Sequence, residues 1–480
     1  MLSLLVDHSP ASSSIHAQIS RQIQIQIETG VLPFGYRLPP TRELARQISI
    51  SRGTAVKAYQ DLTDKGLLES NKKAGTTVRQ KFANVSNEDL KLLGTERFRL
   101  SEQPTPIVQG VNTKSQAATF LPEITAVEHL PIIEFRKAFS NALRYPGYLR
   151  DTGPLLGDLQ LRKQICKHIL PHRGINVDLD QLVIASDVKQ IILLAGLVLN
   201  GEINSVHYGN PGKTELSNLF KVFGFKTVAH SVDNEGITID PFELLPKDVL
   251  IVSPEHHFPT GACLSQARRQ KLIDHQLESG YFILENDSES EYYFDHLPNA
   301  AMFTYTNSQR HLYINSLSTA CFNGLQIAYG VSNREFINEI AKAQKMISKG
   351  VSVLPQRWAA EMISSGAVST HLSRMRNVYR RKRDALKQAL TEVFPLWQVI
   401  LPKGGLQICV EIPQTYSIFD IIAAARRTGA EVMDQVEYFE ECTAPSRLIA
   451  LSFSGDEPKR MKDSLFKLRQ ELDILKVTMI

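Results

Sequence analysis

The sequence has few cysteines and no long apolar run. The five cysteines are Cys166, Cys263, Cys321, Cys409 and Cys442. They are odd in number and form no Cys-x-x-Cys pair and no Cys/His spacing typical of a metal site, so we expect reduced thiols and no bound metal. No run approaches the roughly 18 apolar residues that span a bilayer, and residues 1–7 lack the charged start of a signal peptide. These absences predict a cytoplasmic protein with no membrane contact.

The composition is that of a folded protein with an uneven distribution of charge. At 480 residues the chain exceeds the usual size of a single core, and 43% apolar residues argue against extensive disorder. The net charge is +4, but residues 15–79 hold ten Lys or Arg and five Asp or Glu, a balance of +5. A small basic region therefore precedes a nearly neutral one. Such regions often meet phosphate backbones, although an ordinary solvated surface would have the same composition.

The basic region begins with two helix patterns. Isoleucines recur every four residues, as in an amphipathic helix, at Ile15, Ile19, Ile23 and Ile27. Gly30 stands where this helix would stop. A second helix is expected from Thr41, because Pro39 and Pro40 precede it and a proline near the first helical position needs no backbone donor. Leu44 and Ile48 give this helix an apolar pair.

A third helix and a hairpin follow. Ser51 can cap the helix and Gly66 can end it. The side chains expected to point inward are Ala55, Val56, Tyr59 and Leu62. Residues 67–70 and 76–78, joined by the polar turn 71–75, are typical of two paired strands.

These patterns resemble the GntR family of winged-helix regulators. The series LPPTRELARQISISRGTAVKAYQDLTDKGLLES and the later GTTV carry the resemblance, which covers about 65 residues without a gap. It implies that residues 1–80 form a winged helix-turn-helix that binds double-stranded DNA through the start of its third helix. The residues that it nominates are Arg42, Ser51, Arg52, Thr54, Lys72, Lys73 and Gly75. Arg52 can reach base edges bidentately, whereas Arg42 and the lysines suit phosphates.

Residues 81–117 are polar, lack periodicity and predict a linker, and residues 118–480 predict a second, larger domain. In that domain helix patterns alternate with short β-rich runs, which favours a mostly parallel α/β sheet. The clearest runs are residues 182–184, 249–252, 281–284 and 311–314.

The larger domain resembles fold-type I pyridoxal-phosphate enzymes, in particular the MocR/GabR subfamily, in which such a domain follows a GntR head. The matching pieces are residues 210–212, 254–261, 282–291, 313–329 and 374–383. The resemblance implies a multidomain chain: an α+β winged helix-turn-helix joined to an α/β aminotransferase-like domain. It also implies a homodimer, since enzymes of this fold assemble as dimers.

The cofactor site of that family is expected to be degenerate. Its Schiff-base lysine follows a serine, and Thr319 stands at that position after Ser318. A hydroxyl cannot form a Schiff base. The other pocket positions that depart from the family are Asp187, Asn286, Ser288, Gln326 and Glu437. Asn286 replaces the carboxylate of the pyridine nitrogen, and Asp187 replaces a glycine of the phosphate loop, where Lys189 could offset only part of the repulsion. We therefore expect no catalytic residue and no covalent pyridoxal phosphate.

Two further patterns are given structural interpretations. His256 and His257 are adjacent, so on an extended segment they point to opposite sides, and no third metal ligand is spaced nearby. The basic run 380–383 fits a solvated or interface helix face.

The favoured hypothesis is a DNA-binding regulator whose second domain dimerises and senses a ligand other than pyridoxal phosphate. The alternatives are a regulator that binds pyridoxal phosphate noncovalently, a scaffold with no ligand, and an active aminotransferase, which would need the missing lysine.

Overall fold

The computed structural model describes residues 14–28, 32–48, 50–71, 75–79, 117–144, 146–150, 153–306, 310–434, 438–439 and 447–478. The chain divides into two compact units, residues 1–111 and 112–480. We call them the head and the body and describe each separately. The predicted linker lies outside the described residues except for its last residue, Ala117.

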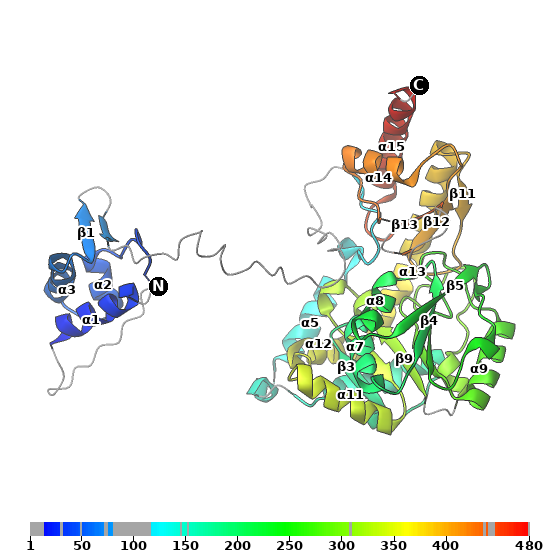
Figure 1. The fold of residues 1–480 in the computed structure, drawn as a ribbon, viewed down its shortest axis with the longest axis horizontal. Coiled ribbons are helices and arrows are strands. Elements are labelled where there is room, and N and C mark those ends of the chain that lie inside the picture. Colours follow the sequence, from blue (N-terminus) through cyan, green and yellow to red (C-terminus); the bar gives the residue numbers. More distant parts are fainter. Residues whose placement is uncertain are drawn as a thin grey trace. The chain divides into compact units, whose positions relative to one another are not determined.

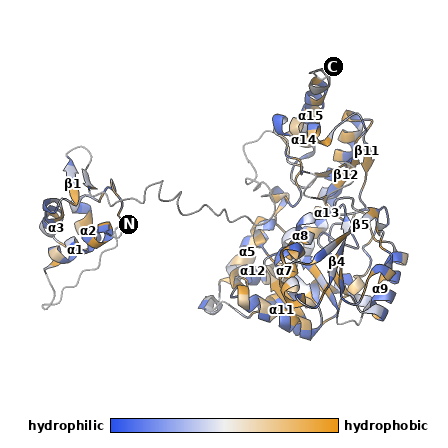
Figure 2. Ribbon diagram, in the orientation of Figure 1, coloured by the Kyte–Doolittle hydropathy of each residue, from blue (hydrophilic) through white to orange (hydrophobic). Residues whose placement is uncertain are grey.

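The head is a three-helix unit with a two-stranded hairpin (Figure 1). Its elements are α1 (Ile15–Glu28), α2 (Thr41–Gln47), α3 (Arg52–Asp64), β1 (Leu68–Asn71) and β2 (Gly75–Val78). The strands pair antiparallel, with Leu68 opposite Val78. Ile19, Ile23 and Ile27 are fully buried in one apolar cluster, while hydrophilic residues alternate with them along α1 (Figure 2). The three predicted helices and the hairpin are confirmed.

One inward prediction for α3 is wrong. Val56 is 46% exposed, whereas Ala55, Ala58 and Tyr59 are buried. The buried positions follow the three- and four-residue spacing of one helix face, and Val56 lies about 100° around the helix from Ala55.

The body is built on an eight-stranded sheet of order β3-β10-β9-β8-β7-β4-β5-β6. Neighbours from β5 to β9 pair parallel, and β10 runs antiparallel between β9 and β3. The strands are β3 (Leu182–Ala185), β4 (Ser205–Asn210), β5 (Lys226–Asp233), β6 (Gly236–Ile237), β7 (Asp248–Val252), β8 (Phe282–Asn286), β9 (His311–Ser316) and β10 (Ala328–Val331). The four predicted β-rich runs fall on β3, β7, β8 and β9, which confirms the α/β prediction.

Helices cover both faces of this sheet. The first part of the body holds α5 (Ile132–Ala142), α6 (Leu159–His168), α7 (Val188–Leu199), α8 (Thr214–Val222), α9 (Gln266–Ser279), α10 (Leu317–Ala320), α11 (Arg334–Ile347), α12 (Val353–Ser364) and α13 (Ala367–Val393). Short 3-10 turns are η1 (Val127–His129), η2 (Pro146–Arg150), η3 (Leu170–Arg173), η4 (Leu179–Gln181), η5 (Pro241–Glu243), η6 (Met302–Tyr305) and η7 (Asn323–Leu325). Alternate residues of β3 and β7 enter different clusters: Val183 and Val249 pack with α7, α8 and α11, whereas Ile184 and Leu250 face the opposite side. Burial of both faces explains the continuous apolar runs.

The end of the body adds a three-stranded antiparallel sheet, β11 (Gln398–Ile400), β12 (Gln407–Glu411) and β13 (Leu448–Ser452). It is accompanied by α14 (Ile418–Thr428) and α15 (Pro458–Thr478). None of the helices in the described part of the chain is long and apolar enough to cross a membrane.

The basic run on α13 differs from its prediction. Lys382 and Arg383 are buried. Their charges are compensated by ion pairs, Lys382 with Glu128 at 3.1 Å and Arg383 with Asp295 at 2.6 Å. Only part of the run is therefore a solvated face.

Candidate functional site

The start of α3 presents the nominated DNA-contact residues at the surface of the head. Ser51 caps the helix: its Oγ accepts a hydrogen bond from the Thr54 amide at 3.1 Å and lies 2.8 Å from the Thr54 hydroxyl. Arg52 is the first helical residue and is exposed, so its guanidinium is free to reach outward. Ser51 and Thr54 are thus committed to the helix end, and Arg52 extends from it.

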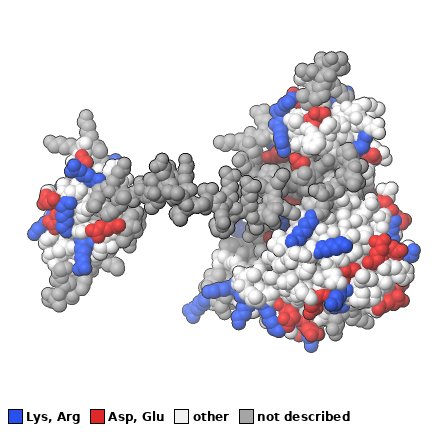
Figure 3. Space-filling view, viewed as in Figure 1, with Lys and Arg blue, Asp and Glu red and all other residues white. Residues whose placement is uncertain are grey.

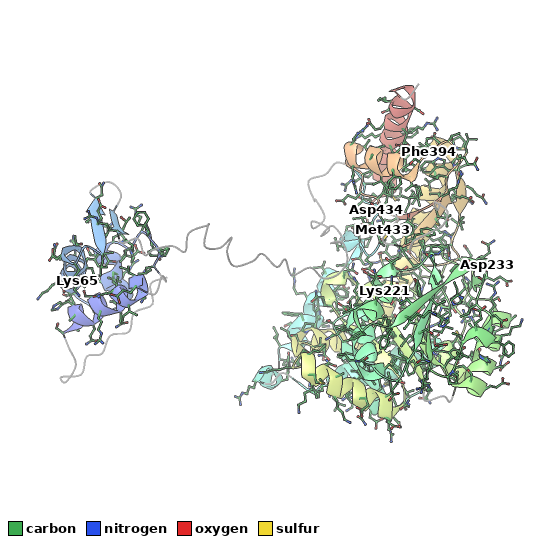
Figure 4. The ribbon with its side chains drawn as sticks, in the orientation of Figure 1. Lys65, Lys221, Asp233, Phe394, Met433 and Asp434 are labelled. Carbon is green, nitrogen blue, oxygen red and sulfur yellow. The ribbon has the colours of Figure 1, made fainter. Side chains whose placement is uncertain are left out.

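Packing fixes which side of α3 faces outward. The Tyr59 hydroxyl donates to the Pro39 carbonyl at 2.9 Å, which ties α3 to the segment before α2. At the other end, Lys65, which is labelled in Figure 4, donates to Gln24 of α1 at 2.9 Å. Arg42 is exposed in the first turn of α2.

Beside the wing, in the segment between α1 and α2, lies one basic residue that the sequence interpretation missed. Gly75 has φ +84°, and a Cβ there would lie 3.0 Å from Nε of Arg37, so Gly75 serves the close approach of that side chain. Arg37 is exposed, and its backbone bridges to Thr77 of β2. In the sequence, Arg37 directly precedes Leu38, the first residue of the series that resembles the GntR family, and this position could have drawn attention to it. Lys72 and Lys73 lie outside the described residues. Figure 3 shows both signs of charge on the visible face of the head.

In the body, Asn286 and Ser288 meet at the carboxyl end of β8. The Ser288 hydroxyl donates to Oδ1 of Asn286 at 2.8 Å, so the amide oxygen of Asn286 is already paired. They line a cavity of about 50 Å³, well below the roughly 300–1,000 Å³ of typical ligand pockets. The other lining residues are Tyr208, Gly209, Gly212, Lys213, Leu216, Ser217, Ile251, Ser253, His256, His257, Phe258 and Glu289.

Lys213 is the one lysine among these lining residues, and its charge is already paired. Its Nζ lies 2.8 Å from a carboxylate oxygen of Glu123. Burial by itself lowers the pKa of Lys213, but Glu123 and Glu289 outweigh burial and raise this pKa above its usual range. The amine is therefore held as an ammonium, which is not nucleophilic.

The N-terminus of α7 is capped by the chain itself. The Asp187 carboxylate accepts a hydrogen bond from the Gln190 amide at 2.7 Å. Lys189, the residue expected to offset the charge of Asp187, instead lies 2.5 Å from a carboxylate oxygen of Glu215. Negative charge thus already occupies the helix end where a phosphate group would bind.

The other predicted pocket residues that the structure describes, Thr319 and Gln326, do not line the cavity at the end of β8. Thr319 lies on α10, directly after β9, with its amide donating to Ser316 at 3.3 Å. Its carbonyl accepts from the Tyr292 hydroxyl at 3.2 Å. Gln326 is exposed with φ +51°, at the end of η7. Glu437 lies outside the described residues.

A buried ionic network lies beside this region and was not predicted. Arg173 holds Asp287 with two hydrogen bonds of 2.6 and 3.0 Å. Tyr313 donates to the same carboxylate at 2.8 Å. Asp287 follows Asn286 directly, yet this pairing leaves it outside the residues that line the cavity. No sequence signal links residues 114 positions apart.

The structure also brings together a group of metal-ligand type. Side-chain atoms of Glu255, Cys263 and His296 lie within 4.8 Å of one another. His257, in contrast, bonds the Pro211 carbonyl at 2.6 Å, as expected for a structural histidine. Neither His256 nor His257 belongs to this group, whose members come from residues 255–263 and from the later residue His296.

Comparison with known proteins identifies both units. Residues 15–78 match the model of the bacterial regulatory proteins of the gntR family, and residues 125–439 match that of the class I and II aminotransferases. The chain is 25% identical over 459 residues to the uncharacterized HTH-type transcriptional regulator YdeL of Bacillus subtilis (strain 168), covering 95% of this chain and 96% of YdeL. It is 23% identical to the probable rhizopine catabolism regulatory protein MocR of Rhizobium meliloti, covering 97% and 95% of the two chains.

Among solved structures, the body resembles LysN, an alpha-aminoadipate aminotransferase from Thermus thermophilus complexed with N-(5'-phosphopyridoxyl)-L-leucine. The TM-score is 0.69 at 22% identity, covering 76% of this chain and 94% of LysN. This likeness establishes the fold of the body.

Proposed function

Since the chain belongs to the class I and II aminotransferase family and begins with a gntR-family domain, we propose that this transcriptional regulator binds operator DNA through Arg52 and has a body that does not hold pyridoxal phosphate. The body instead dimerises the protein and responds to another ligand. Each part of the proposal is argued separately below.

The observation that carries DNA binding is the exposed position of Arg52 at the capped start of α3. In helix-turn-helix proteins the N-terminal residues of this helix contact base edges in the major groove. An arginine there can donate two hydrogen bonds to guanine, which gives sequence preference. Arg42 and Arg37 are exposed on adjoining segments and suit backbone phosphates.

The residues of the body fit pyridoxal phosphate poorly. Asn286 offers an amide where a carboxylate would hold the pyridinium, and that amide is already bonded to Ser288. Asp187 brings a carboxylate to the helix end, and the nearby lysines are neutralised by Glu123 and Glu215. A dianion would be desolvated there without spare positive charge, which costs several kcal/mol.

Dimerisation is supported by an apolar surface around α5. Ile132 and Ile133 are 53% and 80% exposed, and Val127, Phe139 and Leu143 are exposed near them in sequence. A cluster of exposed large apolar side chains typically marks an interface. We expect sedimentation of the full chain to give a dimer; a monomer at micromolar concentration would contradict this part.

The DNA proposal is tested with operators selected from randomised duplexes by the full-length protein. Arg52→Ala is expected to weaken binding to the selected site by about 1–3 kcal/mol and to change binding to random duplex little. Arg42→Ala should weaken both equally, because a phosphate contact does not read sequence. Arg21→Ala, which removes an exposed arginine from α1, is the control. Equal losses on both duplexes for Arg52→Ala would reduce Arg52 to a phosphate contact.

The cofactor proposal is tested by incubating purified protein with pyridoxal phosphate, dialysing it and reducing it with borohydride. We expect no visible absorbance band and no labelled lysine in the peptide mass spectrum. Stoichiometric labelling, for which Lys213 would be examined first, would contradict the proposal. Retention of unreduced cofactor after dialysis would instead support noncovalent binding. A thermal-shift screen of metabolites then seeks the ligand that the body does bind, since such a ligand raises the melting temperature.

A further inference from the structure

The body holds a group of three residues of metal-ligand type, none of which lines the cavity at the end of β8. Glu255 and Cys263 lie on the two arms of a tight hairpin, in which Leu264 donates to the Pro254 carbonyl at 2.8 Å. His296 comes from the loop that follows Asp295. We propose that Glu255, Cys263 and His296 bind one divalent transition-metal ion of the zinc type. The proposal rests on this geometry alone and is independent of the proposed DNA binding.

Two of the three ligand groups, Glu255 and His296, hold unsatisfied atoms. Oε2 of Glu255 and both ring nitrogens of His296 are buried atoms with no hydrogen-bond partner among the described residues. The Glu255 side chain is 1% exposed, and its Oε2 lies 3.9 Å from Nε2 of His296. A buried carboxylate oxygen without a donor costs free energy, so its presence calls for a ligand.

The donor set selects the class of metal. A thiolate, an imidazole and a carboxylate together suit zinc and related transition metals, whereas magnesium and calcium prefer oxygen ligands alone. Around a tetrahedral zinc ion at about 2.0–2.3 Å, ligand atoms are roughly 3.3–3.8 Å apart. The ligand atoms of Glu255, Cys263 and His296 are at present up to 4.8 Å apart. To bind one zinc ion they would have to move closer together by about 1 Å. The His296 loop can supply this movement, since this side chain is 26% exposed. The partly exposed ring of His296 marks the side from which an ion would enter.

Neighbouring groups hold all three ligands in place. Arg269 donates to the carbonyls of Pro254 and Leu264 at 2.7 and 2.9 Å, which fixes both arms of the hairpin. It also donates to Oε1 of Glu255 at 2.8 Å and leaves Oε2 available. On the loop side, Arg383 pairs with Asp295, the residue before His296, at 2.6 Å.

Asn299 connects the hairpin and the loop. Its Nδ2 lies 3.4 Å from Oε1 of Glu255 and 3.9 Å from Sγ of Cys263. A group that bonds two ligands in this way orients them for the metal. Arg173 is paired with Asp287 and Arg269 with Glu255, so the thiolate of Cys263 supplies the remaining negative charge that faces the ion.

The test uses full-length, tag-free protein, stripped with a chelator, reduced without thiols and titrated with Co²⁺. Wild type is expected to bind one Co²⁺ per chain with a near-ultraviolet thiolate-to-cobalt charge-transfer band, and Zn²⁺ should displace it. Cys263→Ser should abolish the band, whereas Cys166→Ser, at another partly buried free cysteine, should retain it.

Two further variants separate ligand from positioning roles. His296→Gln is expected to lower Co²⁺ affinity by more than about 100-fold, and Asn299→Ala by about 10–100-fold, the range for a group that only orients ligands. No stoichiometric Co²⁺ binding in wild type, or a charge-transfer band that survives in Cys263→Ser, would overturn the proposal. If circular dichroism shows that Cys263→Ser does not fold, the His296 and Asn299 variants test the proposal instead. Co²⁺ affinity equal to that of wild type in both of these variants would also overturn the proposal.

Discussion

The interiors of the head and the body differ in kind. Among the described residues of the head, the buried side chains are apolar apart from Ser20. The body buries Arg173 against Asp287, and His311 against Glu285 at 3.1 Å. A small unit gains too little from burial to offset the desolvation of an ion pair, whereas a large one can offset it. The head is therefore specified by hydrophobic spacing, and the body also depends on charge partners.

The largest expected effect comes from breaking the apolar core of the head. Ile23→Ala removes a fully buried side chain and should destabilise the head by about 2–5 kcal/mol, leaving the body unchanged. Ile25→Ala, two residues away and 47% exposed, should change little. Calorimetry of the full chain would show the head transition moving alone. A shift of the body transition by the same amount would mean that the two units do not unfold independently.

The second effect tests the charged interior of the body. Burial, together with the smaller effect of the Asp287 carboxylate, raises the pKa of Glu291 from 4.5 to about 7. Because the folded form holds its proton more tightly, stability falls as pH rises from about 4.5 to 7. Glu291→Gln should therefore stabilise the body by about 1–3 kcal/mol at pH 8 and by nothing near pH 4.5.

This prediction is measured by unfolding the body across that pH range. Glu335→Gln, at an exposed position in the first turn of α11, is the matched control and should change the stability of the body little. A pH-independent difference for Glu291→Gln would show that its carboxyl group is solvated in the folded state.

The smallest expected effect concerns the serine N-cap, a motif that occurs in both units. Ser51 caps α3 in the head and Ser265 caps α9 in the body, each through its side-chain oxygen. Either alanine substitution should cost about 1 kcal/mol in its own unit. Only Ser51→Ala should also weaken DNA binding, because it loosens the start of α3. Calorimetry and DNA titration of both variants measure this; weaker DNA binding by Ser265→Ala would refute the assignment of the interface to the head.

The difference between the apolar interior of the head and the charged interior of the body also explains which features could be predicted from the sequence. The isoleucine stripe and the Ser51 cap are local signals, so the helices of the head and the exposed Arg52 followed from them. Val56 was misplaced because an apolar residue was taken as buried without regard to its angle on the helix. The strands of the body were predictable from apolar runs. The cluster of Glu255, Cys263 and His296 was not, since its members come from two segments that only the tertiary fold brings together.

The cap on α7 bears on how the amount of folded protein is controlled. A ligand that binds only the folded state adds stability that grows with the concentration of the ligand. A domain that needed a bound anion at this helix end would therefore have a melting temperature that depends on the concentration of that anion. The carboxylate that caps α7 belongs to Asp187, so it is covalently attached and its effective concentration at the helix end is constant. On the proposal that the body holds no pyridoxal phosphate, its folded population would not vary with the supply of such phosphate esters.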